Sequence, residues 1–289
     1  MYKFNKSITF VIVCFNSSAV IEKCIKSINS NIKVIVIENS NSKFIKNYLE
    51  KKFSNVKVFL SKKNLGYAAG NNLGISKVKT QYAFILNPDA YLKKDTLKEI
   101  YRAVVSLKDN FSIIAPNLKR NYGYFSKQKY NINKNILPVD YVIGFAMFLN
   151  LRNIKLKEIF DKKFFLFLEE IDLCRRIKKL NKKIFIIRKS KIFHNARKGS
   201  GNSFKIELCR NWHWMWSLFY YNLKHFGIFV AYQVTIGKFF SSLIKLFISL
   251  IFFKKKNFLL NKYRLSGLFN AYIKKPSWLR PDDIKDFNN

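Results

Sequence analysis

The sequence is short of acidic residues. Asp and Glu number 17 against 54 Lys and Arg, which gives a formal charge of +37. Solubility needs far less charge, so the excess points to an anionic partner: nucleic acid, an anionic membrane surface or a phosphorylated substrate. Compositional drift in an AT-rich genome would account for part of the excess without any partner.

Paired cysteines and an export signal are also lacking. The four cysteines, Cys14, Cys24, Cys174 and Cys209, form no C-x-x-C pair and have no histidine at metal-ligand spacing, so nothing predicts a zinc site or a disulfide framework. The N-terminal segment has no small-residue cleavage site and is typical of a first strand. We therefore expect a protein of the reducing cytoplasm.

Several common binding signatures are missing too. The chain contains no Walker A sequence and no G-x-G-x-x-G fingerprint. It also has no RRM, KH or helix-turn-helix signature, and its lysines are spread along the whole length. A nucleic-acid-binding protein would instead gather basic residues and stacking aromatics on one face. Nucleic-acid binding remains the alternative that the charge alone supports.

What the sequence does contain is a regular alternation of strands and helices. Hydrophobic residues make up 49% of 289 residues, enough for a real core. Strand-like apolar runs alternate with helical patterns, which predicts parallel βαβ units with right-handed crossovers and an α/β fold. The predicted strands cover residues 9–15, 33–37, 56–60 and 83–86; helices are expected over 20–28, up to 53, and 68–78.

Polar residues follow these strands, at the edge of a parallel sheet where ligands bind. Pro88 ends the last strand because it offers no N–H, and it delivers Asp89 rigidly to the strand end. An isolated Asn-Pro-Asp would favour a simple turn. Convergence of several strand ends favours a binding site instead. The residues concerned are Asn16, Glu38, Asn39, Asn64, Asn87 and Asp89.

The second half is less regular. A helix is predicted near 96–107, a strand over 141–150, and an apolar run from 164 that leads into a helix beginning with three acids, Glu169, Glu170 and Asp172. Acids at its start and bases at its end suit the helix dipole, which is the structural alternative for these carboxylates. A further strand over 183–193 precedes His194.

The C-terminal region changes character. Residues 228–253 are long and apolar enough for a membrane span. Polar residues nevertheless recur at three- and four-residue intervals and form one stripe on a helix, which favours an amphipathic helix in the membrane interface. Packing on the catalytic domain or on a dimer partner is the alternative. The stripe consists of Thr235, Lys238, Ser241, Ser242, Lys245 and Ser249.

Six segments in order resemble the family 2 glycosyltransferases, and within them the bacterial rhamnosyltransferase-like group: CFN at 14, IENSNS at 37, NLGYAAGNNLGI at 64, FILNPDAYL at 84, FFLFLEEIDLCRRI at 164 and HNARKGS at 194. The resemblance covers residues 7 to about 200. It implies the GT-A fold, an α/β domain with a mixed central sheet, here followed by C-terminal amphipathic helices. We expect a nucleotide-sugar half over 1–95, an acceptor half over 96–206 and a helical membrane-associating region over 207–289.

The resemblance implies inverting transfer of a sugar, rhamnose or another hexose, from a nucleotide diphosphate donor to a glycan or lipid-linked acceptor in cell-surface polysaccharide synthesis. Asp89 matches the carboxylate that holds Mg²⁺ or Mn²⁺. His194 matches a family histidine, as a metal ligand or in a structural role. Glu170 matches the general base, with Asp172 as second candidate. The implied donor-binding residues are Asn16, Glu38, Asn39, Asn64, Gly66, Tyr67, Gly70, Asn71 and Asn87.

Three positions depart from the family pattern. Glu38 and Glu170 stand where the family usually has Asp, and Asn87 replaces the first acid of a full DxD motif. These departures keep a second hypothesis open, a catalytically inactive relative that binds sugar nucleotide. The expected partners are the donor, the acceptor and an anionic membrane surface, with no nucleic acid and a homodimer left open. We expect a peripheral position on the cytoplasmic face of the inner membrane.

Overall fold

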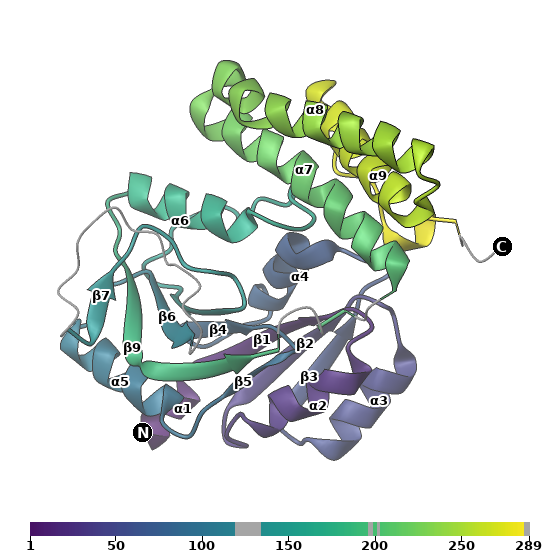
Figure 1. The fold of residues 1–289 in the computed structure, drawn as a ribbon. Helices are drawn as coiled ribbons and strands as arrows, with labels where there is room; N and C mark the ends of the chain where they lie inside the picture. Colours follow the sequence, from purple (N-terminus) through teal and green to yellow (C-terminus); the bar gives the residue numbers. More distant parts are fainter. Residues whose placement is uncertain (119–133, 196–198, 201–202, 286–289) are drawn as a thin grey trace. The chain divides into compact units, whose positions relative to one another are not determined.

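The computed structural model describes residues 1–118, 134–195, 199–200 and 203–285, which divide into two compact units (Figure 1). Unit 1 contains Met1–Asp161 and Glu170–Gly201 and is built on a sheet. Unit 2 contains Lys162–Glu169 and Asn202–Asn289 and is helical. The three-part division expected from the sequence stays a prediction.

The first half of unit 1 is the predicted series of parallel βαβ units. Its strands pair in the order β3-β2-β1-β4, all parallel. The alternating pattern therefore identified both the elements and their direction. Their bounds are α1 Tyr2–Lys6, β1 Ile8–Cys14, α2 Ser18–Lys26, β2 Lys33–Glu38, α3 Lys43–Lys52, β3 Val56–Leu60, α4 Gly66–Ile75 and β4 Tyr82–Leu86.

The second half makes the sheet mixed, as the resemblance implies. The strand order continues from β4 through β8, β6, β9 and β5, and β7 pairs with β9. β4 and β8 are antiparallel, whereas β6 and β9 are parallel. The bounds are β5 Ala90–Leu92, α5 Thr96–Ser106, β6 Ile113–Leu118, β7 Ile136–Pro138, β8 Ala146–Asn150, α6 Glu169–Lys179 and β9 Ile184–His194.

The strand predicted over 141–150 is wrong in its first half. The apolar run over 141–150 forms a strand only from Ala146, the residue that pairs with Leu86. Before it, the carbonyl of Phe145 accepts from the backbone N–H of Asn87 at 2.8 Å, and Gly144 lies beside the side chains of Tyr67 and Glu170. The chain leaves the ladder here because this segment contributes to the site described below.

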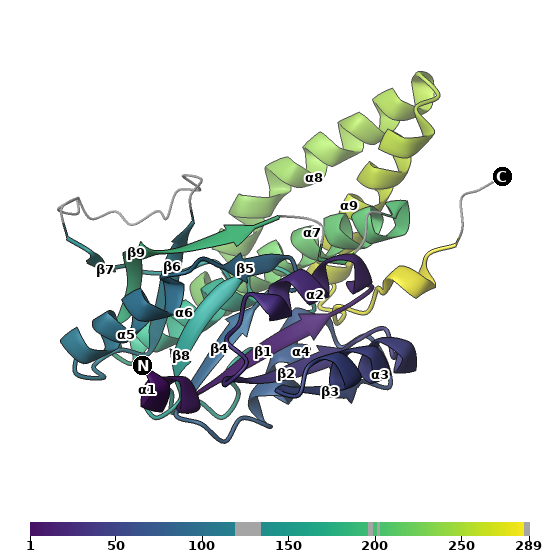
Figure 2. The same ribbon diagram turned by 90° about the horizontal axis from the view of Figure 1, so that it is seen from below.

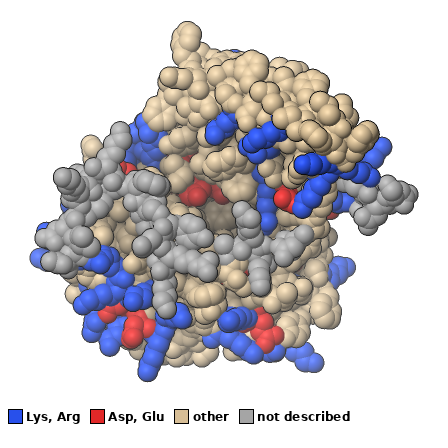
Figure 3. Space-filling view, viewed as in Figure 1, with Lys and Arg blue, Asp and Glu red and all other residues tan. Residues whose placement is uncertain are grey.

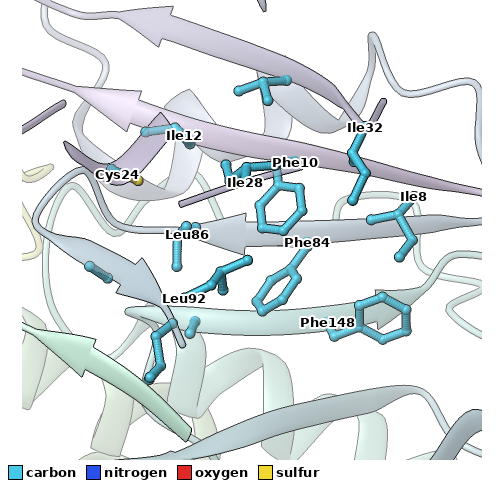
Figure 4. Close-up of a cluster of buried hydrophobic side chains, with 14 of the residues drawn as sticks. Ile8, Phe10, Ile12, Cys24, Ile28, Ile32, Phe84, Leu86, Leu92 and Phe148 are labelled. Atoms are coloured by element: carbon cyan, nitrogen blue, oxygen red, sulfur yellow. The ribbon is translucent and has the colours of Figure 1, made fainter. Parts of the chain in front are cut away.

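The alternation of β1 explains how helices cover both faces of the sheet. Phe10 and Ile12 point to one face and join the main core, where Phe10 stacks on Phe84 with ring centroids 4.7 Å apart (Figure 4). Val11 and Val13 point to the other face and contact α4. Each face is therefore buried under a helix, as a parallel sheet requires.

All four cysteines are buried and unpaired. Cys14, Cys24 and Cys174 lie in unit 1 and Cys209 lies in unit 2. Burial raises the pKa of Cys174 and Cys209 to about 12, and raises the pKa of Cys14 and Cys24 as well. The thiols are therefore protonated and act as core residues.

Unit 2 consists of three long helices that pack against one another: α7 (Phe204–Phe226), α8 (Ile228–Ile251) and α9 (Lys255–Tyr272), followed by the short 3₁₀ helix η1 (Pro281–Asp283). Gly227, with φ of 86°, turns the chain between α7 and α8. In the core, His213 Nε2 lies 2.7 Å from the carbonyl oxygen of Leu279, and burial lowers the pKa of His213 to about 3. His213 is therefore a neutral structural residue.

α8 is long and apolar enough to cross a membrane by length and composition, and only 17% of its most apolar window is buried. Figure 2 shows α8 as a long helix that runs beside α9. A core helix of a soluble protein with the same composition would be mostly buried. The low burial indicates that much of this helix faces outward.

Candidate active site

The loops after β1 and β2 form one edge of the site. Cys14 lies opposite Glu38 in the paired strands, and the N–H of Asn39 donates to the carbonyl of Cys14 at 2.8 Å. Asn16 is in the left-handed region with φ of 52°, which Asn tolerates better than most residues. Its N–H donates to Ser40 Oγ at 2.9 Å. Two strand ends are thus fixed side by side.

Glu38 is a buried carboxylate at this edge. It is 1% exposed, and its Oε1 accepts from the N–H of Ser40 at 2.6 Å. Burial raises its pKa, and the hydrogen bonds from Ser40 and the backbone N–H of Ser42 act in the opposite direction. The carboxylate thus folds back onto its own loop. Its contact with a nucleoside stays a prediction.

Asn39 and Asn64 shape the loop from inside. Asn39 Nδ2 donates to the carbonyl of Gly66 at 3.1 Å, and Asn39 Oδ1 accepts from Ser61 Oγ at 3.1 Å. Asn64 Oδ1 accepts from the N–H of Gly66 at 3.0 Å. The amide of Asn39 is therefore engaged within the protein. These hydrogen bonds hold the loop before α4 in shape.

The rest of this segment, in α4, has two functions. A Cβ on Gly70 would lie 2.9 Å from Val13 Cγ1, and buried Asn71 donates through Nδ2 to the carbonyl of Tyr67 at 3.0 Å. These two residues let α4 pack closely on the sheet. Tyr67 points elsewhere, because its hydroxyl donates to the carbonyl of Gly144.

Asp89 and His194, the two predicted metal ligands, lie together. Ala90 in β5 pairs with His194 in β9, and the N–H of Asn195 donates to the carbonyl of Asp89 at 2.9 Å. His194 Nε2 lies 3.2 Å from Asp89 Oδ1. Asp89 is 6% exposed, and its Oδ1 is buried without a hydrogen-bond donor. A buried acceptor without a donor is unfavourable, which indicates a place for a ligand.

Gly199, beyond His194 in the chain, lies close to this carboxylate. A Cβ on Gly199 would lie 3.1 Å from Asp89 Cγ, so glycine allows the backbone to come close. The hydroxyl of Ser17 donates to the carbonyl of Gly199 at 2.5 Å and ties the segment to the loop after β1. Phe145 stacks on His194 with ring centroids 4.7 Å apart. Residues 196–198 of the HNARKGS motif lie outside the described residues.

The donor set fits a hard divalent cation that also takes ligands from its substrate. The described ranges, which omit 119–133, 196–198, 201–202 and 286–289, hold no group of three or more His, Cys, Asp or Glu that could bind a metal. The carboxylate suits Mn²⁺ or Mg²⁺, with phosphate oxygens and waters as further ligands, and the imidazole lies beside it.

Glu170 lies in the first turn of α6, and Gly144 is its neighbour. A Cβ on Gly144 would lie 3.4 Å from Glu170 Cβ, and Glu170 Oε2 is buried without a hydrogen-bond donor. Burial raises the pKa of Glu170, and the backbone N–H groups of Glu170, Gly144 and Ile171 oppose the rise. Because Gly144 precedes Phe145, contacts run from Glu170 through Phe145 and His194 to Asp89.

Asp172, the second candidate base, forms an ion pair with Arg176. It is fully buried, and its Oδ2 accepts from Arg176 Nε at 2.7 Å. The guanidinium of Arg176 also donates to the carbonyls of Glu158 and Ile159. Asp172 therefore positions the segment before the site through Arg176.

Three contacting residues have no motif that points to them in the sequence: Gly144, Phe145 and Phe160. Phe160 packs edge-on against Tyr67, and both its backbone groups bond to the side-chain amide of Asn72. A glycine inside a predicted strand signals close backbone approach, so Gly144 could have been found. Nothing in the apolar runs around Phe145 and Phe160 distinguishes them from core residues.

The chain is similar to a known protein family over most of its length. The model of the glycosyl transferase family 2 matches residues 9–206. The chain is similar to the low-salt glycan biosynthesis hexosyltransferase Agl10 of Haloferax volcanii, with 23% identity over 60% of this chain and 62% of that protein. It is also similar to the rhamnosyltransferase WbbL of Escherichia coli K12, with 24% identity over 58% of this chain and 75% of that protein.

A solved structure shows the same fold. The mannosyltransferase PcManGT from Pyrobaculum calidifontis, in complex with GDP-Man and Mn²⁺, superposes with a TM-score of 0.57 at 12% identity, covering 92% of this chain and 87% of that one. The chain therefore has the GT-A fold that its sequence motifs predict, with helices at its C-terminal end. The match spans slightly less than two thirds of the length of the Haloferax relative.

Proposed function

Because the chain belongs to glycosyl transferase family 2, we propose that it transfers a hexose, with inversion, from a nucleotide diphosphate donor to a hydroxyl of a glycan or lipid-linked acceptor. The observation that carries the proposal is the pair of carboxylates Asp89 and Glu170, each with one buried oxygen that lacks a hydrogen-bond donor, joined by a short series of contacts. Relatives named for hexosyl and rhamnosyl transfer in glycan synthesis support this class of reaction.

A divalent cation, Mg²⁺ or Mn²⁺, would be held by Asp89 and His194, and it would stabilise the negative charge of the departing nucleoside diphosphate. Two observations support this assignment: Asp89 Oδ1 is buried and accepts no hydrogen bond, and the imidazole Nε2 of His194 lies 3.2 Å from it. Asn87 supplies no charge, so the donor phosphates complete the ligand set.

Glu170 acts as the general base. It takes the proton from the acceptor hydroxyl while that oxygen bonds to the anomeric carbon and the bond from this carbon to the diphosphate breaks. Burial raises the pKa of Glu170, which makes the carboxylate a stronger base than an exposed one. A single base is sufficient, because a diphosphate leaves without protonation, unlike the alkoxide in a glycosidase.

Glu38 and Asn16 bind the nucleoside, and Asn39, Asn64, Gly66 and Gly70 shape the loops that hold it. Their positions at the carboxyl ends of β1 and β2 and in the segment before α4 support this, because ligands of such sheets bind at that edge. Tyr67 and Asn71 link the donor segment to Gly144 and so to the base.

The protein works at the cytoplasmic face of the inner membrane, where it meets a lipid-linked acceptor. The outward apolar surface of α8 and the charge of +37 support this location. Figure 3 shows Lys and Arg on several separate parts of the drawn face of unit 1, which is unlike the single basic patch of a nucleic-acid-binding protein.

The test is transfer and donor hydrolysis by the purified protein, with a panel of sugar nucleotides, with and without Mn²⁺. We expect nucleoside diphosphate release, lost in Asp89→Ala together with Mn²⁺ binding measured by calorimetry. Glu170→Gln should lower transfer about 10² to 10⁴-fold with Mn²⁺ binding retained. Asp140→Asn, an exposed carboxylate in the same unit, is the matched control. Donor binding without turnover by any donor would identify an inactive relative.

A further inference from the structure

In α8 the buried side chains are small and mostly polar, and the exposed ones are large and apolar. This is the reverse of an ordinary surface helix. Its buried residues are small, and three of the four are polar: Ala231, Thr235, Ser242 and Ser249. Large apolar residues are exposed along the opposite side and at the turn after the helix. They include Phe229 (88% exposed), Ile236, Phe240, Ile244, Phe247, Ile251, Phe252 and Phe253 (94% exposed).

The polar stripe predicted from the sequence is therefore divided. Thr235, Ser242 and Ser249 face the neighbouring helices, whereas Lys238 and Lys245 are exposed beside them. Thr235 Oγ1 donates to the carbonyl of Ala231 at 2.7 Å and accepts from the hydroxyl of Tyr272 at 3.1 Å. Small residues with satisfied hydroxyls let helices pack closely, and they leave the large apolar side chains for another surface.

The charges around this apolar face indicate that its binding partner is an anionic surface. Within unit 2, the part of the surface in Figure 3 where α8 lies is nearly free of charged side chains, and Lys and Arg lie along its edge. Lys238 and Lys245 are exposed on the polar side of α8, away from the apolar residues, and Lys254, Lys255 and Lys256 follow its end. A second copy of a chain with charge +37 would be repelled, whereas anionic lipid headgroups attract lysines beside an apolar face.

The positions of the flanking lysines also bear on how α8 meets the bilayer. In a helix that crossed the membrane, Lys238 would lie near the middle of Ile228–Ile251 and Lys245 in its second half. Lysine at the centre of a spanning helix is strongly unfavourable. In a helix lying in the plane of the interface, both ammonium groups remain at headgroup level while the opposite side enters the acyl region.

We propose that the outer face of α8 seats the protein on an anionic bilayer, with the helix lying in the interface and not crossing it. The surface consists of the exposed apolar residues named above, and Lys238, Lys245 and Lys254 contact the headgroups. This inference develops the proposed membrane location and does not depend on sugar-transfer chemistry, so each can fail without the other.

Sedimentation with vesicles of phosphatidylcholine, with and without phosphatidylserine, tests the proposal without any donor present. We expect the full chain to bind the anionic vesicles and to be released by high salt. The double variant Phe240→Glu, Phe247→Glu should weaken binding about tenfold or more, because it removes two apolar anchors. Phe44→Glu alters a phenylalanine on α3 that is more exposed than Phe240 and Phe247 (75% against 54% each), and this variant should bind like the unmodified chain.

A second pair of measurements separates the binding modes. Lys238→Gln with Lys245→Gln should remove much of the preference for anionic lipid and leave the helical circular dichroism unchanged. Membranes carrying the protein should release it in alkaline carbonate, as peripheral proteins are released. Retention in the carbonate pellet would overturn the in-plane arrangement. A lipid-free dimer that Phe240→Glu, Phe247→Glu converts to monomer would show that a second copy covers this face, and would overturn the proposal.

Discussion

At the scale of single residues, the proposed chemistry rests on two carboxylates, each with one buried oxygen that accepts no hydrogen bond. Asp89 is held by backbone contacts at the end of a rigid strand, and Glu170 lies at the start of a helix, in both cases with one undonated oxygen. Such groups are unfavourable for folding, and proteins keep them where a ligand or a proton transfer needs them.

Glu170→Gln should stabilise the folded protein at neutral pH. Burial raises the folded-state pKa of Glu170, so between its ordinary pKa and the raised value the folded state binds more protons than the unfolded state. Stability from this group is therefore fully present at low pH and is lost as pH rises through the raised pKa. The variant should unfold at a higher temperature than the unmodified chain at pH 8, and the difference should shrink on acidification towards pH 4.

The measurement is the thermal midpoint of both proteins from pH 4 to 8, followed by circular dichroism. Glu207→Gln, which alters an exposed carboxylate, controls for loss of negative charge. A midpoint of Glu170→Gln that is lower at pH 8 than that of the unmodified chain would show that the carboxylate is well paired, contrary to the burial effect.

The ion pair of Asp172 and Arg176 should contribute more to the free energy of unfolding than a surface ion pair does. Arg176→Ala removes the partner of a fully buried carboxylate and frees the carbonyls of Glu158 and Ile159. We expect a loss of about 3 kcal/mol in the free energy of unfolding, the typical cost of leaving one charge of a buried pair alone. Urea denaturation measures it, and Asp172→Asn with Arg176→Gln should recover part of the loss.

At the scale of helices and strands, α4 depends on glycine for its contact with β1. A Cβ on Gly74 would lie 2.3 Å from Val11 Cγ1, far inside contact distance. Gly74→Ala should therefore destabilise the protein by about 1 to 3 kcal/mol despite its better helix propensity. Gly237→Ala in α8, where a Cβ meets nothing within 4 Å, should stabilise by about 0.5 to 1 kcal/mol. Equal effects in urea denaturation would contradict the packing argument.

The strands and their direction were predictable, because apolar runs with helical segments between them allow few arrangements. The Asn-Pro-Asp turn and the HNARKGS motif pointed to Asp89 and His194, which lie next to each other although about a hundred residues separate them. The strand over 141–150 was wrong in its first half, because the contacts of Gly144 with Tyr67 and Glu170 are tertiary. The sequence also could not predict which side of α8 is exposed, because residue spacing does not say which side of a helix packs against the protein.

At the scale of the whole molecule, the charge of +37 should oppose folding at low ionic strength. Like charges repel more strongly in the compact state, and the Debye length falls from about 30 Å at 0.01 M salt to about 8 Å at 0.15 M. We expect the thermal midpoint to rise over this range. A midpoint that is unchanged or falls, measured with chloride and no specific anion, would show that local pairing already balances the charge.

The four buried cysteines can report which part of the protein unfolds locally. A thiol that is enclosed and protonated reacts with an alkylating reagent only when the structure around it comes apart. Three of the four report on the sheet unit and the fourth, Cys209, on the helical one. Timed alkylation followed by peptide mass spectrometry would therefore reveal which half of the molecule loosens first, without any label or engineered residue.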